Sequence, residues 1–293
     1  MKVGKYYQAF LALVCSFVLI FSVFPAKSQS QLEFPGSETL PEGYLSDLEY
    51  KDHTIHVKIT AHRAFETDYW VASISIAQPD QLRTASAAGF ESQRTMKGKV
   101  LAQRVHAAFA TNGDYFSYIP DGYLIRQGVL YRNLPNGKRD VLLIDDKGDF
   151  HIELQAGDGI HEAYQDKGIV NSFNFGPALV VDGTRVTEYI DENNAALKGR
   201  QRMAIAQVKR GSLEYILVAC AGPKGKNKGM TLYEFSQIIA QQGVENAYNL
   251  DGGYSTMMIF KDEYINSDYE KTMRKISDII YFVSLHETIP RAD

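Results

Sequence analysis

The sequence predicts an α+β fold, a strand-rich mixed sheet with few flanking helices in a single compact domain. Short β-branched and apolar runs recur along the chain, Gly and Asp turn signals separate them in pairs, and only two segments show helical periodicity. The chain has 293 residues, of which 45% are hydrophobic and 23% charged. That composition is ordinary for a globular protein, and the length suffices for one large or two small domains.

The first 28 residues are typical of an export signal. Lys2 and Lys5 form a positive start, residues 9–24 are almost continuously apolar, and Ala26-Lys27-Ser28 has the small residues that a signal peptidase requires. We therefore expect a secreted, periplasmic or cell-surface protein. An uncleaved anchor is the alternative, because the apolar segment nearly reaches the roughly 20 residues of a spanning helix.

Charge and cysteine content narrow the function classes. Removing residues 1–28 removes three lysines and no acid, so the net charge moves from −4 to −7. That balance gives no indication of nucleic acid binding. The mature chain would keep one cysteine, Cys220, in an apolar run typical of a buried strand, so it cannot form an internal disulfide.

The expected elements follow in order. Residues 29–49 are polar with prolines and glycines, which is typical of an arm or linker. Alternation and β-branched residues predict strands at 56–60 and 70–77, then hairpins at 141–154, 178–186 and 203–220. Asp182-Gly183 is the signal of a type I′ turn in the second hairpin. We expect a signal peptide at 1–28, an arm with the first strand at 29–60, and one catalytic-type domain at 61–287.

Two helices are expected, at residues 95–104 and from Thr231 onward. Thr231 and Glu234 form a capping-box pattern, and Gly243 is a plausible end of the second helix. A strand at 246–250 follows, and the last strand covers about 275–285.

The segment Asn249-Leu250-Asp251-Gly252-Gly253 is the most informative part of the chain. Asn249 and Asp251 alternate at a strand end, so both face a side that would otherwise be core. A carboxylate there must be paired, metal-bound or catalytic. Gly252 and Gly253 let a ligand approach the backbone, and Ser255 follows them. A plain Asp-Gly turn is the alternative.

A similar cluster, Asn112-Gly113-Asp114-Tyr115-Phe116, follows another apolar run. Asn112 and Asp114 show the same alternation around Gly113, and the two aromatic residues could form walls of a pocket. Two such turns in one chain suggest that they share one pocket.

Basic side chains could complete an anion site. Arg126, Arg202 and Arg274 lie beside apolar strand residues, and arginine suits bidentate binding of phosphate. Residues 222–229 precede the helix at Thr231, where backbone amides can hold an anion, although a solvated turn is the alternative.

Acid–base and metal chemistry stay open at this point. Asp251, Asp114 and Glu234 are the candidate catalytic residues, Glu234 besides its capping role. Asp251 and Asp114 could ligate a divalent cation, and the sequence names neither a metal nor a cofactor.

These ordered motifs, from about residue 61 to the C-terminus, resemble the phosphodiester glycosidase family. The resemblance implies hydrolysis of a sugar-1-phosphodiester at the anomeric centre, with release of a free sugar and a phosphomonoester. It implies that Asp251 stabilises an oxocarbenium-like centre or activates water, and that Arg202, Arg274 or residues 222–229 stabilise the departing phosphate. Asp114 and Tyr254 stand where the family often has glycine.

Three functions therefore compete. The first is an exported phosphodiester glycosidase acting on cell-surface or exopolysaccharide phosphodiesters. The others are a metal-dependent phosphodiesterase that cleaves the P–O bond and a non-catalytic polysaccharide-binding protein. The expected partner is a small-molecule or glycan phosphodiester, without nucleic acid, and with membrane contact only through an uncleaved N-terminal segment.

Overall fold

The strands form four sheets in the computed structural model, which describes residues 36–187 and 196–286. The strand-rich α+β class is confirmed, but the strands divide among several sheets instead of forming one. Paired strands in the described residues are antiparallel. These residues lie within one compact unit, Glu33–Asp293.

The largest sheet has nine strands in the order β1-β2-β3-β4-β15-β14-β18-β12-β13. These strands are β1 Tyr44–Ser46, β2 Glu49–Lys51, β3 Ile55–Ala64, β4 Thr67–Ile76, β12 Ala178–Val181, β13 Thr184–Arg185, β14 Arg202–Gln207, β15 Glu214–Cys220 and β18 Asn246–Leu250. The strands β1 and β2 occupy part of the segment that the sequence suggested as an arm.

Two five-stranded sheets have the orders β10-β9-β11-β7-β8 and β20-β19-β6-β21-β5. The first contains β7 Gly122–Arg126, β8 Val129–Leu134, β9 Val141–Asp145, β10 Phe150–Glu153 and β11 Ile169–Phe173. The second contains β5 Leu82–Ser86, β6 Ala107–Asn112, β19 Met258–Phe260, β20 Glu263–Tyr264 and β21 Asp278–Val283. A separate small hairpin joins β16 Pro223–Lys224 to β17 Asn227–Lys228.

Three α-helices are described, α1 Gly98–Arg104, α2 Ile160–Tyr164 and α3 Leu232–Ala240. Short 3₁₀ turns lie at Pro41–Gly43, Pro79–Gln81, Gln165–Lys167, Gly253–Ser255 and Ser267–Thr272. The helix α1 begins three residues later than expected, and α2 was not foreseen. The helix α3 starts after Thr231, whose hydroxyl accepts a hydrogen bond from the Glu234 backbone, as the capping-box pattern predicts.

The three expected hairpins are confirmed as β9–β10, β12–β13 and β14–β15. In the second, both turn residues have positive φ, 46° at Asp182 and 76° at Gly183, as a type I′ turn requires. The sheet to which a strand belongs depends on segments that are distant in the sequence. For example, β6 pairs with β21 from the far end of the chain. Local patterns do not specify such pairings.

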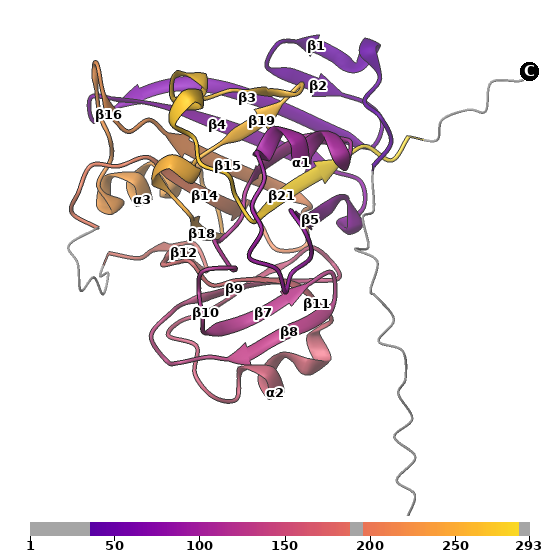
Figure 1. Ribbon diagram of the computed structural model, residues 1–293, viewed down its shortest axis with the longest axis vertical. Coiled ribbons are helices and arrows are strands. Elements are labelled where there is room, and N and C mark those ends of the chain that lie inside the picture. Colours follow the sequence, from indigo (N-terminus) through magenta and orange to yellow (C-terminus); the bar gives the residue numbers. More distant parts are fainter. Residues whose placement is uncertain (1–35, 188–195, 287–293) are drawn as a thin grey trace, which may run out of the picture. The chain divides into compact units, whose positions relative to one another are not determined.

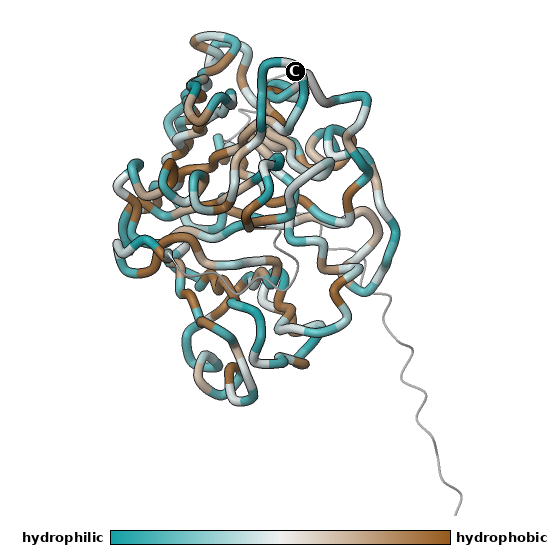
Figure 2. The backbone as a smooth tube through the Cα atoms, turned by 90° about the vertical axis from the view of Figure 1, so that its left-hand side faces the viewer, coloured by the Kyte–Doolittle hydropathy of each residue, from teal (hydrophilic) through white to brown (hydrophobic). Residues whose placement is uncertain are grey.

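A shared core lies between the three large sheets. It contains Tyr215 of β15, whose ring contacts those of Phe282 of β21 and Phe150 of β10. Each of the three large sheets packs against one helix on the face away from the shared core (Figure 1). The helix α3 packs on the nine-stranded sheet, α1 on the sheet of β6 and β21, and α2 on the sheet of β7 and β9. Apolar segments concentrate along the inner strands, whereas the outer turns are hydrophilic (Figure 2).

The expected export signal at residues 1–28 lies outside the described residues. Within 36–187 and 196–286, no helix is long and apolar enough to cross a membrane.

Candidate functional site

Asp251 follows the last residue of β18 and lines a cavity of about 350 Å³. Asn249 lines the same cavity, so the alternation at the strand end places both side chains on one side, as expected. The other lining residues are Phe175, Gly176, Pro177, Ala196, Arg200, Gln201, Arg202, Leu232, Gly252, Gly253 and Arg274.

The two Asn/Asp/Gly turns meet, although 139 residues separate Asn112 from Asp251. The Asn112 side-chain amide donates a hydrogen bond of 2.8 Å to the Asp251 carbonyl, and the Asp251 amide lies 3.4 Å from the Gly113 carbonyl. Asn112 also accepts a hydrogen bond from the Met257 amide at 3.2 Å. The upstream turn therefore fixes the backbone that carries Asp251, but none of residues 112–116 is among the described residues that line the cavity, so the expected shared pocket with aromatic walls has no support.

The environment of Asp251 favours its neutral form. Burial raises its pKa to about 6, and the charge of Asp114 acts in the same direction. The Ser255 hydroxyl, the Arg274 guanidinium and the Gly252 backbone amide lower that pKa, but by less. Only 8% of Asp251 is exposed, so the cavity is its route to solvent. A carboxyl group with this pKa can exchange a proton near neutral pH.

Polar atoms without partners surround this carboxylate. The Asn249 side chain donates to the Gly176 carbonyl at 2.7 Å, and its own oxygen has no hydrogen-bond partner in the described part of the chain. The Ser255 hydroxyl lies close enough to affect Asp251 but makes no well-aligned hydrogen bond there. Buried polar groups are normally paired, so the Asn249 oxygen, on a residue that lines the cavity, indicates a place for a polar ligand.

Two of the three expected arginines line the cavity. Arg202 is buried, and its guanidinium donates to the carbonyls of Met230 at 2.8 Å and Lys198 at 3.0 Å, which orients it. Arg274 is exposed, and its guanidinium carbon lies 5.8 Å from the centre of the Tyr115 ring. Both are placed to interact with an anion in the cavity.

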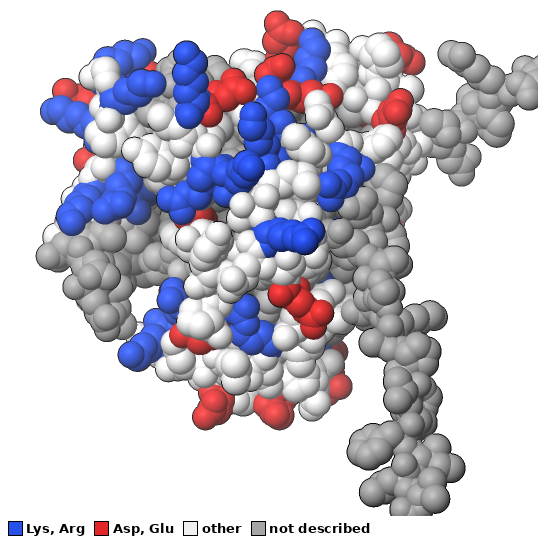
Figure 3. All heavy atoms as spheres, in the orientation of Figure 1, with Lys and Arg blue, Asp and Glu red and all other residues white. Residues whose placement is uncertain are grey.

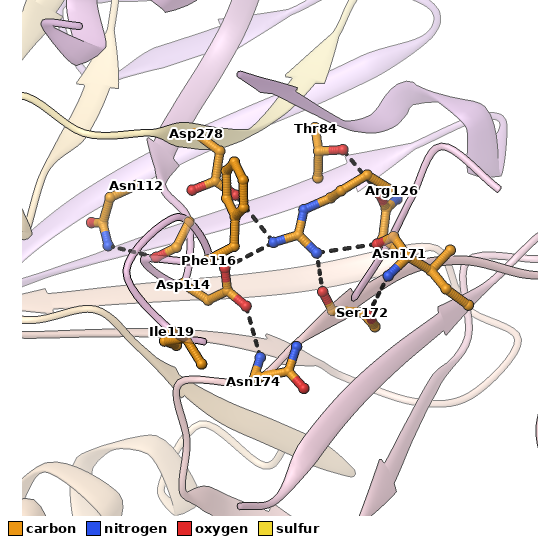
Figure 4. A network of polar contacts seen from close by, with 12 residues as sticks. Thr84, Asn112, Asp114, Phe116, Ile119, Arg126, Asn171, Ser172, Asn174 and Asp278 are labelled. Carbon is orange, nitrogen blue, oxygen red and sulfur yellow. Dashed lines mark hydrogen bonds and ion pairs between the residues drawn. The ribbon is translucent and has the colours of Figure 1, made fainter. Parts of the chain in front are cut away.

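The third arginine, Arg126, is fully buried in a network of polar contacts with Asp114 and Asp278 (Figure 4). Its guanidinium donates to Asp114 at 2.8 Å and to Asp278 at 3.1 Å. It also lies 4.4 Å from the Phe173 ring centre. Neither Arg126 nor Asp114 is among the described residues that line the cavity. Their positions therefore do not support a direct contact of either side chain with a substrate.

The network also supports the upstream turn. The second carboxylate oxygen of Asp114 accepts a hydrogen bond of 2.7 Å from the Asn174 amide. Burial raises the pKa of Asp278, which shares one guanidinium with Asp114. A Cβ atom at Gly113 would lie 2.3 Å from the Asp278 carboxylate, so glycine is required there.

Glu234 is occupied by its capping role. Its carboxylate accepts hydrogen bonds of 2.8 Å from both the amide and the hydroxyl of Thr231. It does not appear among the described residues of the cavity, so the acid/base role considered for Glu234 has no support from its position.

A second cavity of about 640 Å³ adjoins the first and shares Arg200, Gln201, Gly253 and Arg274 with it. Its other lining residues are Lys198, Gly199, Gly222, Pro223, Lys224, Tyr254 and Thr272. Part of the 222–229 segment thus borders the site, although it forms the hairpin β16–β17 and not an open turn. Lys and Arg side chains gather over the upper half of the face shown in Figure 3, and β16 lies at the edge of this half in Figure 1.

Three residues near the site, Gln201, Arg200 and Asp278, were not predicted from the sequence. Gln201 and Arg200 precede β14 in a polar run without a recognisable pattern. Asp278 had a signal, because a carboxylate begins an apolar strand there just as one ends the apolar strand at Asp251. Within the described residues, no group of three or more His, Cys, Asp or Glu is placed to hold a metal ion.

Comparison with known families adds independent information. A family model described as phosphodiester glycosidase matches residues 105–283, which include both Asn/Asp/Gly turns, Arg126, Arg202 and Arg274. A curated relative is the SPbeta prophage-derived uncharacterized protein YomE of Bacillus subtilis, 27% identical over 209 residues. That match covers 67% of this chain and 31% of the relative, so the chain spans about a third of the relative's length.

Solved structures share the fold. The zebrafish N-acetylglucosamine-1-phosphodiester alpha-N-acetylglucosaminidase catalytic domain, auto-inhibited by its pro-peptide, has a TM-score of 0.62 at 19% identity, covering 80% of this chain and 85% of that one. A hypothetical protein from Synechocystis has a TM-score of 0.58 at 17% identity, covering 78% and 62%. A putative exported protein from Burkholderia pseudomallei has a TM-score of 0.50 at 12% identity, covering 74% of each chain.

Proposed function

The chain belongs to the phosphodiester glycosidase family, and from this premise we propose that it hydrolyses sugar-1-phosphodiesters to a free sugar and a phosphomonoester. One observation carries the proposal. Asp251, a carboxyl group whose pKa is raised to about 6, lines a cavity together with Arg202 and Arg274. The cavity thus combines a group that exchanges protons with groups that hold an anion.

The proposed reaction uses these groups separately. The ionised Asp251 accepts a proton from a water molecule as that water attacks the anomeric carbon. The bond between this carbon and the phosphate oxygen breaks, and its electron pair leaves with the phosphomonoester. Arg202 and Arg274 stabilise the departing charge, and the free oxygen of Asn249 can accept a hydrogen bond from a sugar hydroxyl. A phosphomonoester leaves readily, so a strong general acid is dispensable.

The wider setting is also part of the proposal. The apolar and basic pattern of residues 1–28 supports export, and the natural targets would then be phosphodiesters of cell-surface glycans or exopolysaccharides. The negative net charge supports a glycan partner over nucleic acid.

The test is incubation with a panel of sugar-1-phosphodiesters in oxygen-18 water, with and without chelator. N-acetylglucosamine-1-phosphodiesters come first, because the zebrafish relative is named for them. We expect chelator-resistant release of sugar carrying the label. Asp182→Asn, on an exposed hairpin turn where the side chain is 73% exposed, is the matched control for Asp251→Asn.

Each rival function has its own result in this experiment. Label in the phosphate product, with loss of turnover in chelator, would favour a metal-dependent phosphodiesterase. Saturable glycan binding without turnover, unchanged in Asp251→Asn, would favour a polysaccharide-binding protein.

A further inference from the structure

Gln201 lies at the boundary between the two cavities and lines both of them. It directly precedes β14 and is buried, and its side-chain nitrogen has no hydrogen-bond partner within the described residues. Leaving a buried amide N–H unpaired costs about 1–3 kcal/mol. The terminal torsion of glutamine has a broad energy minimum, so the amide can turn toward a ligand oxygen at this boundary.

Glycines on both sides hold Gln201 in place. A Cβ atom at Gly222 would lie 2.7 Å from the Gln201 Cγ atom, and one at Gly252 would lie 2.8 Å from its carbonyl oxygen. The Gly253 amide donates a hydrogen bond of 2.9 Å to that same oxygen. The two glycines after Asp251 therefore position Gln201 beside the carboxylate.

The charge around this boundary is positive. Arg200 and Arg274 line both cavities, and Lys198 and Lys224 line the second. Among the described residues of the second cavity there is no aspartate or glutamate. An anion at Gln201 would thus lie in cavities that two guanidinium groups also line, and guanidinium groups suit the geometry of phosphate.

We propose that Gln201 is a substrate-binding residue that donates a hydrogen bond to the phosphate of a phosphodiester spanning both cavities. The proposal rests on the function proposed above, with the sugar in the cavity of Asp251. The group beyond the phosphate then occupies the larger cavity, where Tyr254 is 54% exposed and offers a ring for stacking.

The test measures binding of inorganic phosphate and glycerol-3-phosphate by titration calorimetry, independently of turnover. Gln201→Met keeps the side-chain volume and removes the donor, so we expect binding at least tenfold weaker than in the wild type. Gln201→Glu adds a negative charge and should weaken binding further. Thermal unfolding of each variant checks that the fold is intact.

Two glycine-to-alanine variants, one a test and one its control, leave Gln201 itself unchanged. Gly222→Ala displaces the Gln201 side chain and should weaken phosphate binding in the same direction. Gly157→Ala is the matched control, because a Cβ atom there meets its nearest neighbour at 3.9 Å, and it should bind phosphate as the wild type does.

The outcomes separate the two proposals. The assignment of Gln201 is overturned if the wild type fails to bind phosphate, or if Gln201→Met and Gln201→Glu both bind phosphate as tightly as the wild type does. Absence of sugar release with phosphate binding that depends on Gln201 rejects the hydrolase and leaves the phosphate site supported. If Gln201→Met does not fold, Gln201→Glu and Gly222→Ala decide the question.

Discussion

The Asn112–Asp114 turn contacts two groups of acidic and basic side chains, a buried network through Asp114 and the cavity group through the backbone of Asp251. In the buried network, Arg126 contacts both Asp114 and Asp278 at hydrogen-bond distance and the aspartates are sealed from solvent. In the cavity, Asp251 forms no ion pair with another described residue, and Arg274 affects it through its charge alone. The same residue types thus hold the fold in one place and leave a reactive group in the other.

The buried network should show the largest effect on stability. Arg126→Met leaves Asp114 and Asp278 without their common cation, so we expect a loss of about 3–5 kcal/mol in the free energy of unfolding, measured by denaturant titration. Arg210→Met, at an exposed ion pair, should lose less than about 1 kcal/mol. Equal losses in the two variants would contradict the contrast between the network and the surface.

The cavity should show its main effect on rate. Asp251→Asn removes the proposed base, so kcat/KM should fall about 100-fold or more, while Asp182→Asn stays near wild type. Retention of full activity by Asp251→Asn would remove Asp251 from the mechanism.

Asp251 should also cost stability when its carboxyl group is ionised. Its pKa is raised in the fold, from 3.8 to about 6, so its ionisation favours the unfolded chain. Below about pH 4 the carboxyl is neutral in both states. The loss of folding free energy caused by ionisation of Asp251 grows between about pH 4 and pH 6 and reaches its full value above about pH 6. Asp251→Asn should therefore be more stable than wild type by about 2–3 kcal/mol at pH 7.5, but not at pH 4. Denaturant titration at both pH values checks this, and a pH-independent difference would contradict it.

The pH dependence of the rate should report the same group. Because the proposed base must be ionised, kcat/KM should fall tenfold per unit as pH decreases below about 6 and level off above it. A rate that rises toward low pH would instead assign Asp251 the role of an acid.

The smallest effect should come from Glu234. Glu234→Ala removes two hydrogen bonds to Thr231 at the start of α3 and should lower stability by about 1 kcal/mol with kcat/KM unchanged. A large decrease in kcat/KM with unchanged stability would instead support a catalytic role for Glu234.

Local features were predictable to the extent that their causes are local. The Asp182-Gly183 turn, the Thr231–Glu234 cap and the strand before Asp251 depend on the conformational preferences of adjacent residues. The sequence could not predict that Arg126 lies in the buried network whereas Arg202 lines the cavity, because both arginines stand beside apolar strand residues. Burial of Arg126 depends on Asp114 and Asp278, and the latter is 152 residues away along the chain.

The sequence by itself therefore determined the strand-rich α+β character, the hairpins, the helix cap and the family resemblance carried by its ordered motifs. Tertiary structure decided the number of sheets, the sealing of Arg126 and the meeting of Asn112 with Asp251. It also decided that Gln201 stands between two cavities. The physical reason is that turns and caps are stabilised within a few residues, whereas sheet pairing, burial and cavities arise only when distant segments pack together.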